Sequence, residues 1–265
     1  MIREAESVGA VFARCHAQRK AAFIAFLTAG FPSLALTPQL IRAAAHAGAD
    51  MIEVGFPYSD PLADGPLIAA SSQRALANGV TFDTVLELAI RANSPVPLIA
   101  FCYYNPLFAR GFARSAADLR SAGFAGLIVP DLPPEEAGGL IDALAAQDLS
   151  ISFLVAPTTP VARAREIARL CSGFVYVAGR MGVTGTHARP HETLRERLDE
   201  LRKATKKPLA AGIGISSPED VARVSPYADG VIVGSALIQA AGSGDPVEAV
   251  EKTCAALSRA RRRLT

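Results

Sequence analysis

The sequence predicts an α/β protein of the closed (β/α)8 class, the TIM barrel. Short apolar segments alternate with longer amphipathic, Ala-rich segments along the chain, which indicates βαβ units around a parallel sheet. Eight such units fit within 265 residues, and a barrel of this kind takes roughly 250 residues. A doubly wound sheet is the alternative, but the first apolar segment lacks a following Gly-x-Gly-x-x-Gly turn and no linker divides the chain. We expect one domain over residues 1–265.

Each strand is expected where about 4–7 mostly apolar residues follow one another, as in strands buried on both faces. These segments are Ala22–Thr28, Met51–Val54, Pro97–Cys102, Gly126–Val129, Ser150–Val155, Phe174–Val177, Pro208–Ala211 and Gly230–Val233. Helices are expected at Leu36–Ala47, Phe82–Ala92, Ala113–Ala122, Pro134–Ala145, Pro160–Leu170, Thr193–Ala204, Pro218–Val224 and Val247–Arg261. Several begin with proline, which fits the first helical turn. The first twenty residues alternate charged and apolar side chains, which predicts an extra N-terminal helix.

Composition and charge exclude several classes of protein. The chain carries 27 Lys and Arg against 25 Asp and Glu, for a formal net charge of +2, so it lacks the basic surface that binds nucleic acid or an anionic membrane. The densest basic cluster, which runs from Arg259 to Arg263, is interpreted as a solvated helix end. No apolar run approaches the roughly 18 residues that span a bilayer. Four scattered cysteines without metal-ligand spacing favour a reduced, cytoplasmic protein with no metal site.

The second predicted strand contains a carboxylate. Catalytic side chains of a barrel lie at the carboxyl ends of its strands, and strand alternation places Glu53 on the same face as Met51 and Gly55. Burying a carboxylate is costly unless it is paired, so Glu53 is either satisfied by a buried Arg or hydroxyl or retained for function. In the functional interpretation, a raised pKa lets Glu53 give and take a proton near pH 7.

The loop after this strand carries more acidic side chains on a stiff backbone. Ser59, Asp60 and Asp64 lie among three prolines within ten residues, and proline restricts the loop. An ordinary turn would explain one of the aspartates, but it does not easily explain two beside a strand glutamate. The combination predicts paired carboxylate chemistry without a metal.

Glycines follow the last three predicted strands. Backbone N–H groups at this end of a barrel often bind phosphate, and tight turns without a ligand are the alternative for each loop. The segment from Gly179 to His191 is long and polar, as a lid would be. The segments Phe101–Pro106 and Val129–Pro133 are expected to line either an apolar pocket or a protein interface.

Together these segments resemble the tryptophan synthase alpha chain family. The matching motifs are LTAGFPS, AGADMIEVGFPYSDPLADGP, SSQRALANGVT, YYNPL, LIVPDLPPEE, GVTG and ADGVIVGSALI, in the family's order from about Ala22 to Ile238. The resemblance implies a TIM barrel that cleaves indole-3-glycerol phosphate to indole and glyceraldehyde 3-phosphate, with no metal or cofactor of its own. It also implies a partner, a pyridoxal phosphate (PLP)-dependent beta chain, in a complex of two alpha and two beta chains.

The resemblance further implies a role for each matching residue. Glu53 matches the family's acid/base glutamate, and Asp64 matches the aspartate that binds the indole N–H and stabilises positive charge on the ring. Asp60 lies in the loop that communicates with the beta chain. The implied substrate and phosphate residues are Tyr176 near the catalytic glutamate, Phe26, Phe101 and Ile213 in the indole pocket, Thr184 on the lid, and Gly185, Gly214, Gly234 and Ser235 around the phosphate.

The chain differs from the family's common pattern at Tyr58, Met181 and Ile213, while both carboxylates are retained. Two further functions stay open at this point. Beside the lyase subunit that the resemblance implies, these alternatives are a subunit that acts mainly as an allosteric activator of its beta partner and a stand-alone lyase that releases free indole. A different phosphate-binding barrel, such as a sugar-phosphate isomerase, does not account for the motif SDPLADGP.

Overall fold

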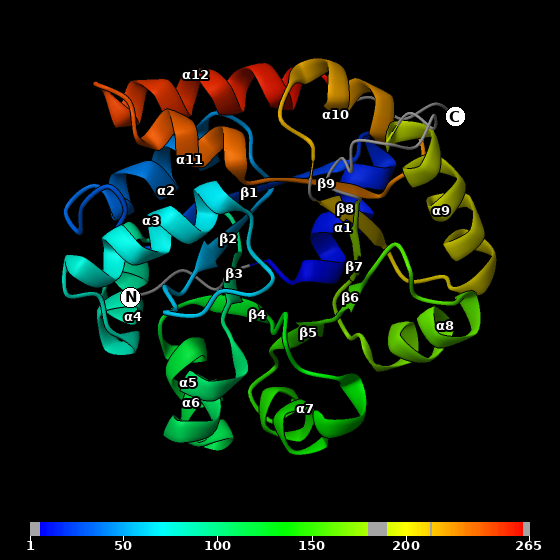
Figure 1. The fold of residues 1–265 in the computed structure, drawn as a ribbon, viewed down its shortest axis with the longest axis horizontal. Coiled ribbons are helices and arrows are strands. Elements are labelled where there is room, and N and C mark those ends of the chain that lie inside the picture. The colour runs from blue at the N-terminus through cyan, green and yellow to red at the C-terminus, as the bar shows by residue number, and fades with distance from the viewer. Residues whose placement is uncertain (1–5, 180–189, 213, 262–265) are drawn as a thin grey trace.

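The strands form one parallel sheet that curves around a central axis, with helices outside it (Figure 1). The computed structural model describes residues 6–179, 190–212 and 214–261. Within them the strand order is β5-β4-β3-β2-β1-β9-β8-β7-β6. The strands are β1 Ala22–Thr28, β2 Met51–Gly55, β3 Leu98–Phe101, β4 Phe124–Ile128, β5 Ser150–Ser152, β6 Leu154–Val155, β7 Val175–Ala178, β8 Leu209–Gly212 and β9 Gly230–Val233.

The barrel closes through a strand that is broken in the middle. The strands at the two ends of the order, β5 and β6, follow each other in the chain with only Phe153 between them. Strand β5 pairs with β4, and β6 pairs with β7. At the break, the Ser152 hydroxyl accepts a hydrogen bond from the Phe174 N–H at 3.0 Å. The predicted eight-stranded barrel is therefore confirmed, with its fifth strand divided in two.

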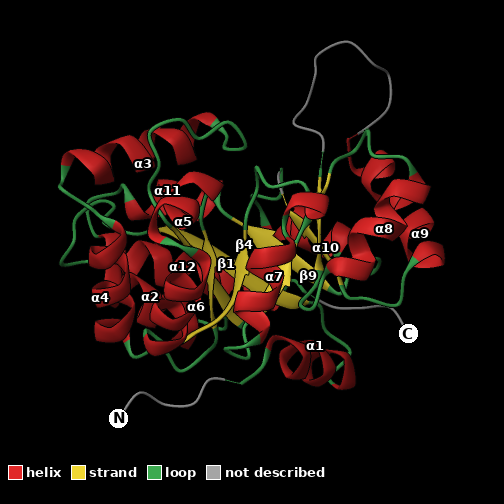
Figure 2. Cartoon of the chain, turned by 90° about the horizontal axis from the view of Figure 1, so that it is seen from below, coloured by secondary structure: helices red, strands yellow, loops and turns green. Residues whose placement is uncertain are grey.

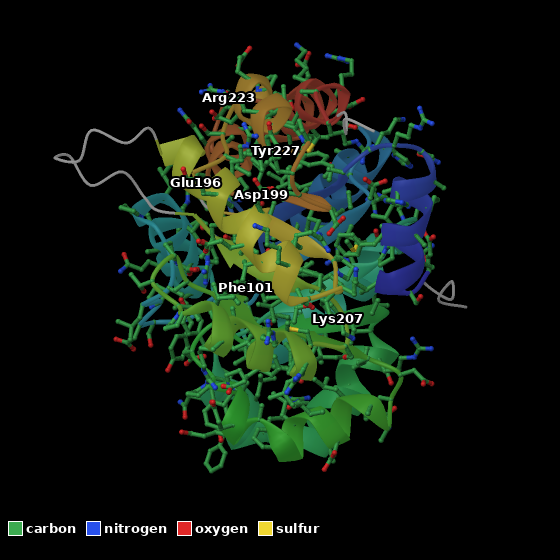
Figure 3. The ribbon with its side chains drawn as sticks, turned by 90° about the vertical axis from the view of Figure 1, so that its right-hand side faces the viewer. Phe101, Glu196, Asp199, Lys207, Arg223 and Tyr227 are labelled. Atoms are coloured by element: carbon green, nitrogen blue, oxygen red, sulfur yellow. The ribbon has the colours of Figure 1, made fainter. Side chains whose placement is uncertain are left out.

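Within the described ranges, eight of the helices cover the outside of the barrel, as the amphipathic segments predicted. They are α2 Thr37–His46, α4 Phe82–Ala92, α6 Phe112–Ser121, α7 Gly138–Ala145, α8 Val161–Leu170, α9 Pro190–Ala204, α10 Pro218–Val224 and α12 Pro246–Arg259. Helix α9 illustrates the pattern, since Leu194, Leu198 and Leu201 are buried while Glu196 and Asp199 are exposed. Figure 3 shows the side of the molecule that carries α9, with charged side chains along its outer helices.

Further short helices lie outside this alternation. They are α1 Val8–Ala17, α3 Pro66–Ala77, the 3-10 turn η1 Pro134–Glu136, α5 Tyr104–Arg110 and α11 Ser235–Ala241. The prediction of α1 is confirmed, and α1 covers the amino ends of the strands (Figure 2). There the rings of Phe12 and Phe174 lie 5.6 Å apart. Helices α3, α5 and α11 follow β2, β3 and β9, so they stand at the carboxyl ends of the strands.

The C-terminal basic cluster is only partly solvated, which corrects the interpretation of it as a solvated helix end. The side chain of Arg261 is 11% exposed and forms an ion pair with Asp50, which is itself buried. Asp50 also accepts hydrogen bonds from Arg14 at 3.2 Å and from the Phe23 N–H at 2.9 Å. Asp50 therefore ties α1, β1 and the end of the chain together beneath the barrel.

The surface helices carry no sign of a membrane span. Among the helices within the three described ranges, none combines the length and the apolarity that crossing a bilayer requires.

Candidate active site

A pocket opens at the carboxyl ends of the strands. It brings together seven residues that the sequence singled out, from β1, β3, β7 and the loops after β2, β8 and β9: Phe26, Asp64, Phe101, Tyr176, Gly214, Gly234 and Ser235. Its other lining residues are Ala63, Gly65, Ile68, Leu154, Gly179, Ile215 and Ile232. This pocket therefore lies at the end of the barrel where the sequence predicted the site.

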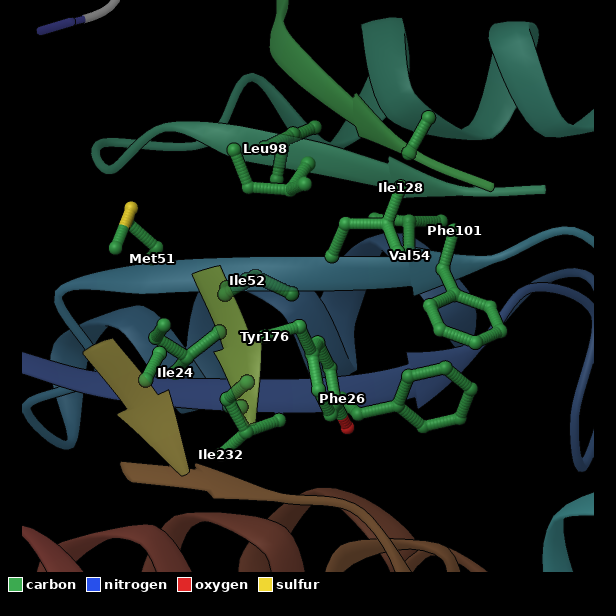
Figure 4. Close-up of a cluster of buried hydrophobic side chains, with 14 of the residues drawn as sticks. Ile24, Phe26, Met51, Ile52, Val54, Leu98, Phe101, Ile128, Tyr176 and Ile232 are labelled. Carbon is green, nitrogen blue, oxygen red and sulfur yellow. The ribbon is translucent and has the colours of Figure 1, made fainter. Parts of the chain in front are cut away.

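Aromatic rings form one wall of the pocket. Phe26 and Phe101 meet edge to face, with ring centroids 5.6 Å apart and an interplanar angle of 88°. Figure 4 shows these two rings at one end of their strands near Tyr176, while Met51 lies toward the other end of β2. Such a wall suits a flat aromatic ligand, because ring pairs of this kind are favourable beyond the area they bury.

Two glycines make room for these rings. A Cβ atom added at Gly55 would lie 2.6 Å from the ring of Phe26, and one at Gly212 would lie 2.4 Å from the Tyr176 hydroxyl oxygen. Gly55 and Gly212 are the last residues of β2 and β8. A side chain at either position would push an aromatic ring out of place, so glycine shapes this wall of the pocket.

Glu53 is buried beneath the pocket, and no described residue forms a hydrogen bond with its carboxyl group. It pairs in register with Phe26 on β1 and Ile99 on β3, so its side chain points into the barrel with theirs. It is 0% exposed, and among the described residues neither of its carboxylate oxygens has a hydrogen-bond partner. Burial raises the pKa of Glu53 from 4.5 to about 8, since desolvation disfavours the charged form. Among the described residues, no Arg or hydroxyl binds Glu53, so the alternative of a paired structural glutamate is not observed there.

Asp64 lies higher in the pocket in a more polar setting. It is half-buried in the loop between β2 and α3 and lines the pocket. Burial raises its pKa from 3.8 to about 6, and the nearby Tyr103 hydroxyl opposes that rise. At neutral pH Asp64 is therefore mostly ionised while Glu53 is mostly protonated. Two carboxyl groups with different protonation states are what a site needs in order to divide acid and charge-stabilising roles.

The glycine-bearing loops after β8 and β9 both reach the pocket. Gly214 has a φ of +83°, a conformation that favours glycine. Gly234 precedes Ser235, the first residue of α11. The first N–H groups of a helix have no acceptor within the helix. Here they stand at the pocket rim, and the lining residues that the structure describes include no Lys or Arg.

The remaining predicted residues lie elsewhere. Asp60 is exposed and outside the pocket lining, and it accepts a hydrogen bond from the Ser59 hydroxyl at 2.6 Å. Thr184, Gly185 and Ile213 fall outside the described residues, as does most of the expected lid.

Several lining residues did not stand out in the sequence. Leu154 and Ile232 were expected as strand residues only, and Ile68 lies on α3, a helix that was not predicted. Tyr103 was noted only within an aromatic segment. Its hydroxyl accepts a hydrogen bond from the Ala63 N–H at 3.0 Å. This bond joins two loops far apart in the chain, and no local pattern signals such a contact.

No metal-binding group was found within the described ranges. Three or more His, Cys, Asp or Glu side chains do not come together there in a way that could hold an ion.

The fold and the pocket define a protein of the (β/α)8-barrel class, with an aromatic-walled pocket and two unequal carboxyl groups at the carboxyl ends of its strands. The family model of the tryptophan synthase alpha chain matches residues 12–263. The chain is 45% identical over 244 residues to the tryptophan synthase alpha chain of Gloeobacter violaceus, covering 91% of this chain and 88% of that one. It is 43% identical over 245 residues to that of Picosynechococcus, covering 90% and 93%.

Solved structures agree with the sequence comparison. A chain in the aminoacrylate-bound tryptophan synthase of Mycobacterium tuberculosis superposes with a TM-score of 0.88 at 33% identity, covering 97% of this chain and 100% of that one. The protein therefore belongs to the tryptophan synthase alpha chain family. This family cleaves indole-3-glycerol phosphate to indole and glyceraldehyde 3-phosphate in tryptophan biosynthesis, and the chain is accordingly a lyase.

Proposed function

We propose that Glu53 is the acid and base of the cleavage. As a neutral acid it protonates C3 of the indole ring, and the resulting carboxylate takes the proton of the glycerol hydroxyl as the carbon–carbon bond breaks. The products are indole and glyceraldehyde 3-phosphate, and Glu53 ends the cycle protonated as it began. A pKa of about 8 suits a group that must be protonated at neutral pH and still accept a proton readily.

In this proposal Asp64 accepts a hydrogen bond from the indole N–H of the substrate. Protonation at C3 leaves positive charge on the ring, and an ionised carboxylate beside the ring nitrogen stabilises that charge. Asp64 is on the pocket lining with Phe26 and Phe101, so an indole ring packed against these two phenyl groups lies beside the loop that carries Asp64. The less enclosed setting of Asp64 keeps its pKa at about 6, below that of Glu53.

In this proposal the glycine-bearing loops after β8 and β9 bind the phosphate group of the substrate. Gly214, Gly234 and Ser235 line the pocket, and Gly185 joins them by its match to the family. Backbone N–H groups and a helix terminus bind a phosphate without a basic side chain. Tyr176 and Ile213 are assigned to the wall around the indole ring, and Thr184 to a contact with Asp64 across the lid.

The observation that carries this proposal is the buried, unpartnered carboxyl of Glu53. It is tested by indole release from indole-3-glycerol phosphate with Glu53→Gln and Asp64→Asn. Each variant keeps the shape of its side chain but cannot exchange the proton or carry the charge. We expect losses of about 10²–10⁴-fold for Glu53→Gln, and undiminished release would refute its role.

Exposed apolar side chains lie on the loop after β2 and on α5, both at the carboxyl ends of the strands. We infer that this surface takes the beta chain, in a complex of two alpha and two beta chains, with PLP bound by the beta chain only. Leu62 is 92% exposed and Phe108 is 63% exposed, and Phe108 stacks on Tyr104 at 5.6 Å. Exposed large apolar side chains at one rim indicate an interaction site. Asp60 lies two residues from Leu62 in the same loop, in keeping with its assignment to the interface.

The degree of dependence on that partner separates the three functions that the sequence left open. Indole release by the chain alone is compared with release after mixing with a beta chain. High activity alone indicates a stand-alone lyase. Weak activity that rises by orders of magnitude only in the complex favours a chain that acts mainly as an activator of its beta partner, and clear activity alone that rises further in the complex indicates the lyase subunit. We further propose that the chain acts in the cytoplasm as one barrel domain over residues 1–265.

A further inference from the structure

A second groove lies at the end of the barrel opposite the active-site pocket. It is lined by Arg165, Ala168 and Arg169 of α8 and by the segment 204–207, which begins at the last residue of α9. Both helices end there and lead into β7 and β8, so the groove stands at the amino ends of those strands. No residue that lines this groove also lines the pocket, so a ligand bound in the groove does not meet the substrate.

Positive side chains stand on both walls of this groove. Arg165 and Arg169 are four positions apart on α8, so they project from one face of that helix. Lys206 and Lys207 belong to the segment after α9 and form the other wall. Figure 3 shows Lys207 on the side of the molecule that carries α9. The whole chain has a formal net charge of only +2, so these four residues are a strong local excess of positive charge.

The acidic side chains next to the groove are bound to other arginines. Arg163, also on α8, forms ion pairs with Glu135 and, at 3.3 Å, with Glu166. Arg202, in the last turn of α9, forms an ion pair with Asp229. Within the described ranges, by contrast, no ion pair joins the four cations of the groove to an acidic side chain. Their charge is therefore not balanced by the chain's own carboxylates.

The helix macrodipole explains only part of this arrangement. A cation in the last turn of a helix is stabilised by the carbonyl groups there, which accounts for Arg169 in the last turn of α8. The effect falls off within that turn, so it does not account for Arg165 at the middle of the same helix. Like charges four positions apart on a helix destabilise it. An anion between Arg165 and Arg169 would relieve that repulsion.

The floor of the groove leaves room for a ligand and offers it a hydroxyl group. Ala168 and Ala204 are small, and the cations surround a volume of about 340 Å³, within the range of roughly 300–1,000 Å³ that small-molecule sites have. The Thr205 hydroxyl oxygen accepts a hydrogen bond from the Lys207 N–H at 3.0 Å. This bond fixes the turn after α9, and the hydroxyl keeps its own proton to donate.

From this geometry we propose that the groove binds a small anion that carries two linked phosphate groups. Each wall supplies two cations, so one phosphate group lies against the arginines and the other against the lysines. Guanidinium groups bind phosphate oxygens through paired N–H donors, and lysine supplies a compact positive charge. A single phosphate group would reach only one wall. The site differs in kind from the pocket, whose described lining residues include no Lys or Arg.

The test is a titration of the isotope-labelled full chain with inorganic pyrophosphate at low salt, followed through the backbone amide resonances. We expect saturable shifts at residues 165–169 and 204–207, and a dissociation constant about tenfold lower than that of inorganic phosphate. Arg169→Gln and Lys206→Gln are each expected to weaken binding by about three- to fivefold. Shifts confined to the pocket residues Gly234 and Ser235, or no saturable shifts, would overturn the inference.

Arg91→Gln is the matched control for Arg169→Gln. Arg91 is an exposed arginine in the last turn of α4, as Arg169 is in the last turn of α8, so both variants lose the same charge at the same kind of position. Unchanged affinity for pyrophosphate is expected in Arg91→Gln. An equal loss in the two variants would show a response to overall charge alone, and equal affinities for phosphate and pyrophosphate would show that the two walls do not act together; either result overturns the proposal.

Discussion

Replacing Glu53 with glutamine is expected to stabilise the protein while abolishing its chemistry. The carboxyl is 0% exposed and has no hydrogen-bond partner within the described ranges, and its pKa is about 8 in place of 4.5. Each unit of pKa corresponds to about 1.4 kcal/mol, so keeping this group ionised in the folded state costs about 5 kcal/mol. Glutamine keeps the shape and is never charged.

The stabilisation expected from Glu53→Gln depends on pH. Between pH 4.5 and 8 the folded protein holds a proton on Glu53 that the unfolded chain has lost, so the free energy of unfolding falls as pH rises. The Glu53→Gln variant has no titrating group at this position, so this fall in the free energy of unfolding is absent from it. The variant's free energy of unfolding should exceed that of the unmodified chain, and we expect this difference to be about 3–4 kcal/mol larger at pH 8 than at pH 5.

Urea unfolding at pH 5, 6, 7 and 8 measures this difference. The chain contains no tryptophan, so far-ultraviolet circular dichroism is the suitable signal. Glu87→Gln is the control, because Glu87 is exposed on α4 and such surface changes stay within about 0.5 kcal/mol. A stability difference for Glu53→Gln that is the same at every pH would refute the inference that the buried carboxyl is protonated.

Three further outcomes are expected. The pH profile of kcat/KM is bell-shaped, with an acidic limb near pH 6 as Asp64 protonates and a basic limb near pH 8 as Glu53 ionises; a flat profile between pH 5 and 9 would contradict both roles. Gly212→Ala loses about 1–3 kcal/mol by crowding Tyr176, seen as a lower urea midpoint, whereas an unchanged midpoint would show that the ring has room to move. Asp50→Ala loses about 3–5 kcal/mol, because it leaves a buried arginine unpaired; a loss below about 1 kcal/mol in the same measurement would mean that Arg261 reaches solvent.

Local sequence patterns predicted most of the barrel. Strands β1 and β9 and helices α4 and α10 have the bounds that were expected, because apolar runs and amphipathic periodicity are properties of neighbouring residues. The break at Phe153 could not be predicted, since it depends on the pairing of each half of that strand with a different neighbour. Helices α3 and α5 were missed because they lie in Pro- and aromatic-rich loops that lack a clear apolar stripe.

The site, like the fold, has features that the sequence predicted and features that only the tertiary structure decided. The sequence placed Glu53 inside a strand and Asp64 in a stiff loop at its end, and its motifs indicated the family, because these features are carried by consecutive residues. Only the tertiary structure decided that Glu53 has no hydrogen-bond partner among the described residues, that Tyr103 binds the backbone of Ala63 from 40 positions away, and that Arg261 reaches Asp50. Such contacts form when closure of the barrel brings distant strands together. The burial that follows sets the pKa values on which the proposed chemistry depends.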